Sequence, residues 1–127
     1  MTRLQVALAL ALAVVASACG PKTVPLPNES ATKFEEFVQP DVPETFSRYP
    51  IALASLARGW RFLQAGDTRE AEREFLVSLR AAPEFFPAET ALGYVELARK
   101  DAKAALEHFE RALLQNGRYP SALVGGG

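Results

Sequence analysis

Two stretches of the chain, GWRFLQAGDTREAEREFLVS (residues 59–78) and GYVELARKDAKAALEHFERA (residues 93–112), carry the same pattern 34 residues apart. Matching residues recur in register: Gly59 with Gly93, Asp67 with Asp101, Ala71 with Ala105, Phe75 with Phe109, and Ser78 with Ala112. A fixed period of this length is typical of stacked helix–turn–helix units, each of which buries its apolar face against a neighbour. The pattern therefore predicts a helical solenoid.

The bulk composition narrows the class of function. A length of 127 residues leaves room for one small domain with a leader and a linker. The formal net charge of −1 lacks the imbalance that nucleic-acid-binding surfaces show, so we expect no nucleic-acid partner. The single cysteine, Cys19, excludes an intrachain disulfide framework, and the single histidine, His108, argues against a histidine-based metal site.

Residues 1–18 have the pattern of a secretory signal peptide. A basic start at Arg3 precedes an apolar run from Leu4 to Ala16, and small residues follow it. The run is shorter than the roughly 20 apolar residues that a membrane-spanning helix needs. We therefore expect a leader that is removed by a signal peptidase.

The end of this leader resembles the lipobox of bacterial lipoproteins. Ala16-Ser17-Ala18-Cys19 offers the cysteine before which such precursors are cut, although leucine is the usual residue at the position of Ala16. The resemblance implies a mature chain that is acylated at Cys19, and several acyl chains are needed because one alone anchors only marginally. Gly20, where aspartate would imply inner-membrane retention, implies the periplasmic side of the outer membrane. The alternative is an ordinary signal peptide with an incidental cysteine.

Residues 19–49 form the next division, which holds the lipid-attachment cysteine and a proline-rich tether. Six of the nine prolines lie between Gly20 and Pro50, and each favours extended backbone, so we expect a semi-stiff spacer. Within it, Phe34, Phe37 and Val38 share one face at helical spacing. We expect these side chains to pack on the exposed N-terminal flank of the repeats. The alternative is a peptide that docks on a partner.

The repeats resemble the tetratricopeptide repeat (TPR) family over residues 50–117, with units at about 50–83 and 84–117. The matching residues of the first unit are Gly59, Phe62, Gly66, Asp67, Ala71, Phe75, Ser78 and Pro83. Those of the second are Leu92, Gly93, Asp101, Ala105, Phe109 and Ala112, and its departures are Glu96, Lys100 and Gly117. The resemblance implies an all-α fold, a right-handed αα-hairpin solenoid of about two TPR units plus the start of a third, preceded by an irregular Pro-rich segment.

Local signals place four helices near residues 51–64, 68–81, 87–99 and 102–115. Asp67 and Glu70 form a capping-box pattern, and Gly66 suits the left-handed conformation that ends a helix. A glycine within a helix is destabilising by ~0.5–1 kcal/mol relative to alanine, so Gly59 and Gly93 imply close helix packing. We expect small residues to let helix backbones approach and two phenylalanines to fill the wedge between hairpins. The repeat-packing residues are then Gly59, Ala71, Phe75, Gly93, Ala105, Phe109 and Ala112.

Residues 118–127 repeat the start of the second unit. Tyr119-Pro120 parallels Phe86-Pro87, so a further helix is expected to begin near Pro120. Repeat arrays generally need about three units and a polar capping helix. We therefore expect the chain to be the N-terminal part of a longer array, and the alternative is that this end docks on a partner or on a second copy. The apolar residues expected at that end are Leu106, Leu113 and Leu123.

Nothing in the sequence assembles an active site, and we expect no catalytic residue, cofactor or metal. His108 is interpreted as a surface or groove residue, Ser78 as a small packing residue, and Trp60 as a ring packed under the tether. The TPR resemblance implies partner binding on the concave surface of the first helices of each unit, where arginines offer a planar fork of donors to carboxylates. The candidates are Arg58, Arg61, Phe62, Tyr94, Glu96 and Arg99, and the alternative is that these are ordinary surface residues.

Together these features predict a non-enzymatic, lipid-anchored TPR scaffold. It would bind a protein or peptide partner at the periplasmic face of a bacterial outer membrane. Two alternatives stay open. The chain is the accessory or targeting region of a longer enzyme or assembly factor, or it is a self-associating structural lipoprotein.

Overall fold

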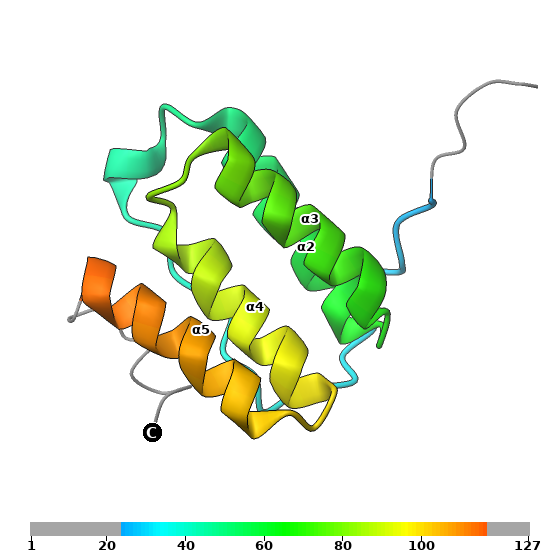
Figure 1. Cartoon of the computed structure of the whole chain (residues 1–127). Coiled ribbons are helices and arrows are strands. Elements are labelled where there is room, and N and C mark those ends of the chain that lie inside the picture. The colour runs from blue at the N-terminus through cyan, green and yellow to red at the C-terminus, as the bar shows by residue number, and fades with distance from the viewer. Residues whose placement is uncertain (1–23, 117–127) are drawn as a thin grey trace, which may run out of the picture.

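The computed structural model describes residues 24–116, and this part of the chain is all-helical, without a strand. The four longer helices form two hairpins that lie side by side, α2 with α3 and α4 with α5 (Figure 1). Every predicted helix boundary agrees with the structure to within one residue. The signal peptide, Cys19 and residues 118–127 lie outside the described residues. The elements are η1 (Glu44–Phe46), α2 (Pro50–Gln64), α3 (Thr68–Ala81), α4 (Phe86–Ala98) and α5 (Ala102–Gln115).

The second helix of each hairpin begins with the same cap. The Asp67 carboxylate accepts a hydrogen bond from the backbone amide of Glu70 at 3.2 Å, and Asp101 accepts one from Ala104 at 3.0 Å. Each bond satisfies an amide that has no partner within its helix. The predicted N-terminal cap at Asp67 is confirmed, and the same geometry recurs 34 residues later in the chain.

The turns that precede these caps differ in residue type but share a conformation. Gly66 has φ +84° and Lys100 has φ 63°, so both adopt the left-handed region. The prediction for Gly66 is confirmed. Lys100 carries a side chain into a conformation that destabilises non-glycine residues by roughly 1–2 kcal/mol. The repeat therefore dictates the backbone of this turn even where glycine is missing.

The glycines within α2 and α4 are explained by aromatic rings. A Cβ atom at Gly59 would lie 2.4 Å from the Phe75 ring, and one at Gly93 would lie 2.4 Å from the Phe109 ring. Close packing at both glycines is thus confirmed, but the contact differs from the expectation. Each phenylalanine covers the glycine of its own hairpin, so the ring takes the space of the missing side chain within the hairpin itself.

The core runs continuously through both hairpins. The packing residues predicted on the second helices are all buried, with relative exposures of 0–1%. Ser78 does more than fill a small position, because its hydroxyl donates to the Ala52 carbonyl at 2.8 Å and joins α3 to α2. Between the hairpins, Ala82 and Phe85 are also fully buried. The buried predicted residues are Ala71, Phe75, Ala105, Phe109 and Ala112.

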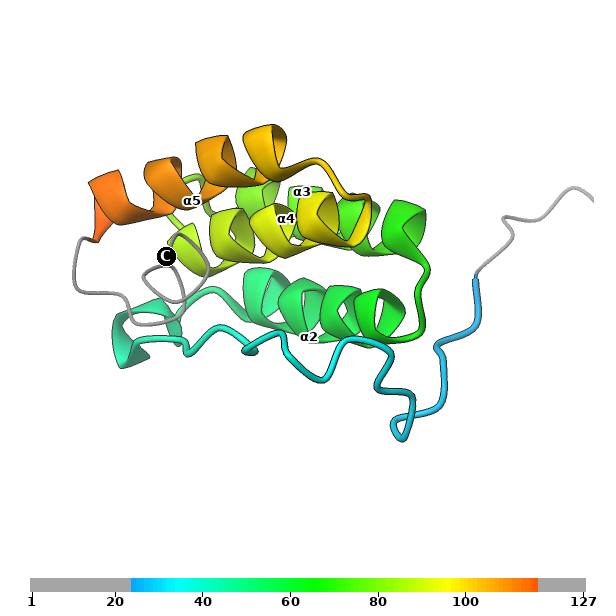
Figure 2. The same ribbon diagram turned by 90° about the horizontal axis from the view of Figure 1, so that it is seen from below.

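The segment before α2 does not extend away from the helices as a spacer. Figure 2 shows it running along α2, and several of its backbone groups bond to that helix. Its last part is well packed: Pro40 is buried, and the Phe46 ring lies 5.1 Å from the ring of Phe85 and 5.4 Å from that of Phe86. We call residues 24–39 the arm and residues 40–49 the linker. Composition indicated extended backbone here, but apolar contacts with the helices hold the segment against them.

Candidate functional site

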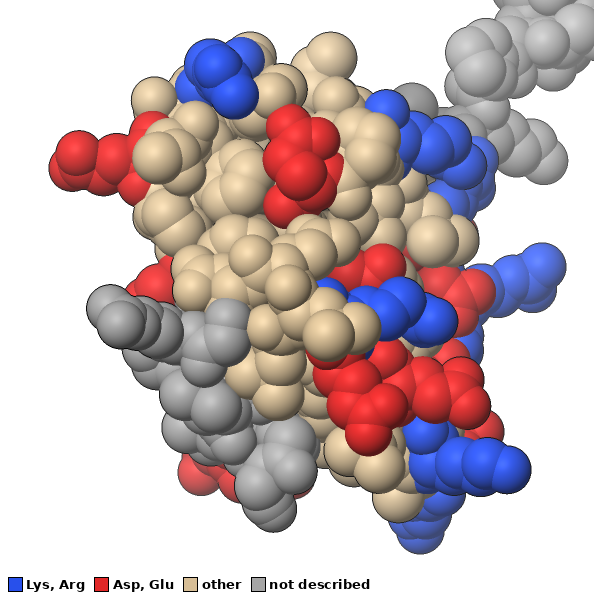
Figure 3. Space-filling model, turned by 60° about the vertical axis from the view of Figure 1, so that its left-hand side comes forward, with Lys and Arg blue, Asp and Glu red and all other residues tan. Residues whose placement is uncertain are grey.

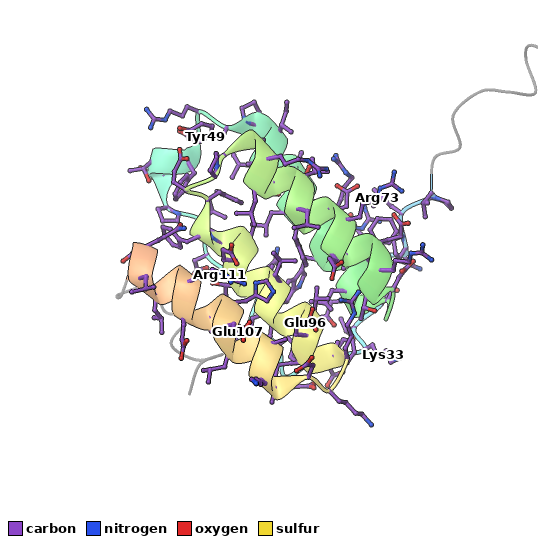
Figure 4. All side chains as sticks on the ribbon, in the orientation of Figure 1. Lys33, Tyr49, Arg73, Glu96, Glu107 and Arg111 are labelled. Carbon is purple, nitrogen blue, oxygen red and sulfur yellow. The ribbon has the colours of Figure 1, made fainter. Side chains whose placement is uncertain are left out.

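The candidate site is the face formed by α2 and α4, which the arm covers. The arm passes Gln64 at the end of α2, and the chain reaches Tyr49 at the start of that helix (Figure 2). Lys33 and Tyr49 accordingly lie at opposite ends of the hairpins (Figure 4). The segment therefore runs the length of α2 in the direction opposite to the helix. A linear peptide from another protein could lie between α2 and α4 in the same way.

Gln64 grips the backbone of the arm at two points. Its side-chain oxygen accepts from the Phe34 amide at 2.9 Å, and its side-chain nitrogen donates to the Phe34 carbonyl at 3.0 Å. The backbone carbonyl of Gln64 also accepts from the Lys33 amide at 2.8 Å. Gln64 is buried, with an exposure of 8%, so these bonds satisfy polar groups that have little access to water. Because they involve only main-chain atoms of the arm, they select an accessible backbone and not a side chain.

Aromatic rings link the arm to the core of the second hairpin. Phe34 and Phe37 stack with centroids 4.7 Å apart, and Phe37 lies 4.8 Å from Tyr94 on α4. Tyr94 contacts Trp60 at 5.7 Å and Phe109 at 5.4 Å, both edge to face. Offset and edge-to-face pairs are each worth about 0.5–1.5 kcal/mol beyond the area that they bury. The prediction that these aromatic side chains pack on the repeats is confirmed. They lie on the face that α2 and α4 form.

Tyr94 carries a hydroxyl into this contact. The hydroxyl is buried and makes no hydrogen bond of ordinary geometry, although the Val38 amide is near enough to act on it. Burial raises the pKa of Tyr94, and the Val38 backbone amide opposes this only in part. The phenol is therefore neutral at ordinary pH and is covered by the arm.

Arg61 makes the third contact with the arm. Its Nη2 donates to the Pro27 carbonyl at 2.5 Å, while its Nε is buried without a partner. We expected this guanidinium to grip carboxylates of an extended peptide. In the structure it holds a backbone carbonyl of the chain's own arm, so it is already occupied.

The six predicted partner-binding residues separate into three groups. Arg61 and Tyr94 meet at the arm, and Phe62 is buried in the core with an exposure of 3%. The others form ion pairs. Arg58 pairs with Glu74 on α3 at 3.2 Å, and Arg99 at the end of α4 pairs with Glu96 of the same helix at 3.2 Å and with Glu72 on α3. Those charges tie helices together, so they have structural partners on the described surface.

Gln64 was missed at the level of sequence. The residue at the equivalent position of the second unit is Ala98, so a polar side chain has replaced a small one just before a helix end. That difference between repeats is the one signal in the sequence that marks the position. The sequence gives no sign that Gln64 binds Phe34, because the two residues are 30 positions apart in the chain.

A second polar cluster joins α4 to α5. Glu89 lies 2.9 Å from His108 Nδ1 and 3.5 Å from Arg111 Nε, and Arg111 points from α5 toward α4 (Figure 4). Arg111 Nη2 is also 3.0 Å from the same His108 nitrogen, which cannot donate to Glu89 and accept from Arg111 at once. Burial raises the pKa of Glu89, but the hydrogen bond with His108 and the charges of Arg111 and His108 outweigh it, so the pKa of Glu89 is lowered. This cluster therefore holds α4 and α5 together, and we call it the polar lock.

The charged surface is mixed in sign. On the face in Figure 3, acidic and basic side chains lie next to one another along one side, and separate charged side chains stand among the uncharged ones elsewhere. Within residues 24–116, no three His, Cys, Asp or Glu side chains gather in a way that suits a metal ion. No helix in that range is both long enough and apolar enough to cross a membrane.

No protein-family model, curated protein or solved structure matches this chain. Its function is therefore inferred from its own residues.

Proposed function

We propose that this chain is a non-enzymatic scaffold of the tetratricopeptide type that binds linear protein segments on its α2–α4 face. We further propose that acylated Cys19 anchors it in a bacterial envelope, on the periplasmic side of the outer membrane. The observation that carries the binding proposal is the arm itself. A proline-containing segment, which turns at residues 28–31 and 34–37, already lies on this face and is held through its backbone.

The chemistry of the face suits a peptide better than a small molecule. Gln64 pairs with both backbone groups of Phe34, and Arg61 binds the carbonyl of Pro27. Main-chain bonds supply affinity in such binding modes, and side-chain pockets supply specificity. Here the specificity element is the aromatic surface of Tyr94 and Trp60.

The repeat geometry supports the TPR assignment. Caps, left-handed turns and glycine–phenylalanine contacts recur at the same period in both hairpins. An array built in this way presents the first helices of successive units along one side, which forms an extended surface for linear partners. The fold alone does not choose the partner, so the assignment of function depends on the residues of the face.

The anchor and the binding face need separate experiments. Expressed from its own reading frame in a bacterium with two membranes, the full chain should sediment with outer membranes, and Cys19→Ala should appear in the soluble fraction. Equal retention of both forms would contradict the lipid anchor.

The binding face is tested by crosslinking in intact cells and purification from the membranes. Gln64→Ala and Tyr94→Ala should lose a protein that the unmodified chain captures, because both lie on the face. Arg69→Ala on the exposed side of α3 is the matched control and should retain it. A partner retained by all three variants would contradict binding on this face.

A second candidate, self-association, is favoured by one surface. On α5, Leu106 is 47% exposed and Leu114 is 86% exposed, and Leu113 next to them is half-buried. Large apolar side chains grouped on one helix commonly mark a surface that another chain covers. If this candidate holds, Leu106→Glu should convert a dimer or larger assembly to monomer in analytical ultracentrifugation. A chain that is monomeric before the substitution would exclude it.

A further inference from the structure

We propose that the arm is an intramolecular ligand of the α2–α4 face, and that it must leave before a linear partner segment with a similar turn can bind there. This inference rests on the proposed peptide-binding function and adds its regulation and the chemistry of the partner. The partner offers one residue with a free amide and carbonyl, an aromatic ring three residues later, and a carbonyl upstream.

The arm and the linker are held to different extents. In the arm, Phe34 and Phe37 are only half-buried, and Val38 is 43% exposed. In the linker, Pro40 is buried and Phe46 is 7% exposed. A segment with few buried apolar contacts opens at lower free energy than the core to which it is joined. The structure thus places a boundary between residues 39 and 40, where the arm separates from a linker that stays packed.

The arm also leaves space beneath it. One hollow of about 450 Å³ lies between Val24, Leu26 and the helices α2 and α3, beside the α2–α4 face. Another of about 380 Å³ lies on that face, between the arm and Trp60. Leu26 remains 42% exposed beside the first hollow. The arm therefore covers the face without filling it, and a segment with larger side chains has room to bury more apolar area.

Occupation by the arm and by a partner is mutually exclusive. Both polar atoms of the Gln64 side chain are used by Phe34, and the exposed face of Tyr94 is used by Phe37. Release of the arm leaves Gln64 without these bonds, so a segment that restores them is favoured over an empty face. When the competent state is a fraction of the population, apparent affinity is reduced by that fraction. Loosening the arm should therefore strengthen binding in trans.

The arm's own sequence supplies the probe. A labelled peptide of residues 24–39, VPLPNESATKFEEFVQ, is titrated with the purified full chain, and binding is followed by fluorescence anisotropy. Phe37→Ala in the protein weakens the arm but leaves the face intact, so it should lower the apparent Kd of the peptide about tenfold. Val38→Ala, at the adjacent exposed position, is the control and should leave the Kd unchanged within about twofold.

Substitutions on the α2–α4 face distinguish release of the arm from a general loosening of the protein. Gln64→Ala also weakens the hold on the arm, but it removes the grip that the peptide needs, so it should not gain affinity. A peptide in which Phe37 is replaced by alanine should bind at least about tenfold more weakly to every form. Circular dichroism checks that each variant keeps its helices, and Phe34→Ala replaces Phe37→Ala if the latter loses them.

The outcomes decide the inference separately from the proposed function. Equal peptide affinity for the unmodified chain and for Phe37→Ala, or for Phe34→Ala where that variant replaces it, would overturn it, as would tighter binding by Gln64→Ala. If instead the arm variants bind the peptide more tightly while no partner is captured from membranes through this face, the inference stands and the scaffold function is wrong.

Discussion

The two hairpins share an apolar design and differ in their polar residues. In both, a phenylalanine of the second helix covers a glycine of the first, and the second helix begins with an aspartate cap. The polar pairs between helices differ in which helix carries the carboxylate. Arg58 on α2 pairs with Glu74 on α3, whereas Glu89 on α4 pairs with His108 on α5. His108 stands 34 residues after Glu74, so the same place in the hairpin accepts a carboxylate or an imidazole.

The comparison shows which positions define the repeat. A ring buried against a glycine fits only where the glycine has no side chain, whereas a partly exposed polar pair can be exchanged for another polar pair. The surfaces of the two hairpins are consequently free to differ. The arm covers the first hairpin through Gln64, and the second leaves Leu106 and Leu114 exposed on α5.

Removal of the two buried phenylalanine rings is the most severe test of whether the hairpins are equivalent. Phe75→Ala and Phe109→Ala should each lower the free energy of unfolding by about 3–5 kcal/mol, because both rings are fully buried. Urea unfolding followed by circular dichroism measures this loss. Leu114→Ala, at an 86% exposed position, should change it by no more than about 0.5 kcal/mol. A small loss at only one ring would show that the hairpins are not equivalent.

The glycines test the same contact from the other side. Gly59→Ala and Gly93→Ala should each destabilise by about 1–3 kcal/mol through overpacking, although alanine is the better helix former. Adding Phe75→Leu to Gly59→Ala should give a loss smaller than the sum of the two single losses, because the shorter side chain relieves the overlap. A stabilising effect of either alanine would mean that the ring does not occupy the space that a Cβ atom needs.

The polar lock of the second hairpin predicts a pH dependence. The pKa of Glu89 is lowered below its usual value of 4.5, so its contribution to stability is present above that value and is lost as the pH falls through the folded-state pKa. Between about pH 6 and pH 3 the unmodified chain should lose on the order of 1 kcal/mol more than Glu89→Gln does. Parallel stability curves for the two proteins would contradict the lock.

The turns predict the smallest change. Lys100→Gly should stabilise the second hairpin by about 0.5–1 kcal/mol, since glycine adopts its positive φ without strain. Gly66→Ala should destabilise the first hairpin by about 1 kcal/mol for the opposite reason. Thermal unfolding of the two variants measures both signs, and a destabilising Lys100→Gly would indicate that the lysine side chain contributes a contact of its own.

The helices could be predicted because their signals are local. Asp67 and Asp101 mark helix starts within a few residues of the amides that they cap, and Gly66 marks a turn by its own conformational freedom. Gly59 and Phe75 were both recognised as packing residues. The pairing of one with the other was not, because it depends on how two helices cross.

The site could be predicted only in part because its partners are distant in the chain. Arg61 and Tyr94 were selected for the face and do lie on it, but the bonds of Gln64 to Phe34 join residues 30 apart. Arg99 was selected for a partner, whereas Glu72 and Glu96 neutralise it from neighbouring positions. The anchor at Cys19 and the third repeat unit stay predictions.

With a lipid anchor at Cys19, the bound arm would set the height of the helices above a membrane. If Cys19 carries the anchor, about five residues separate it from Val24, and a chain of that length spans at most about 18 Å. With the arm released as far as Pro40, the same anchor allows up to about 75 Å. Occupation of the α2–α4 face would then be coupled to distance: the closed form stays near the bilayer, and the open form reaches structures well beyond it.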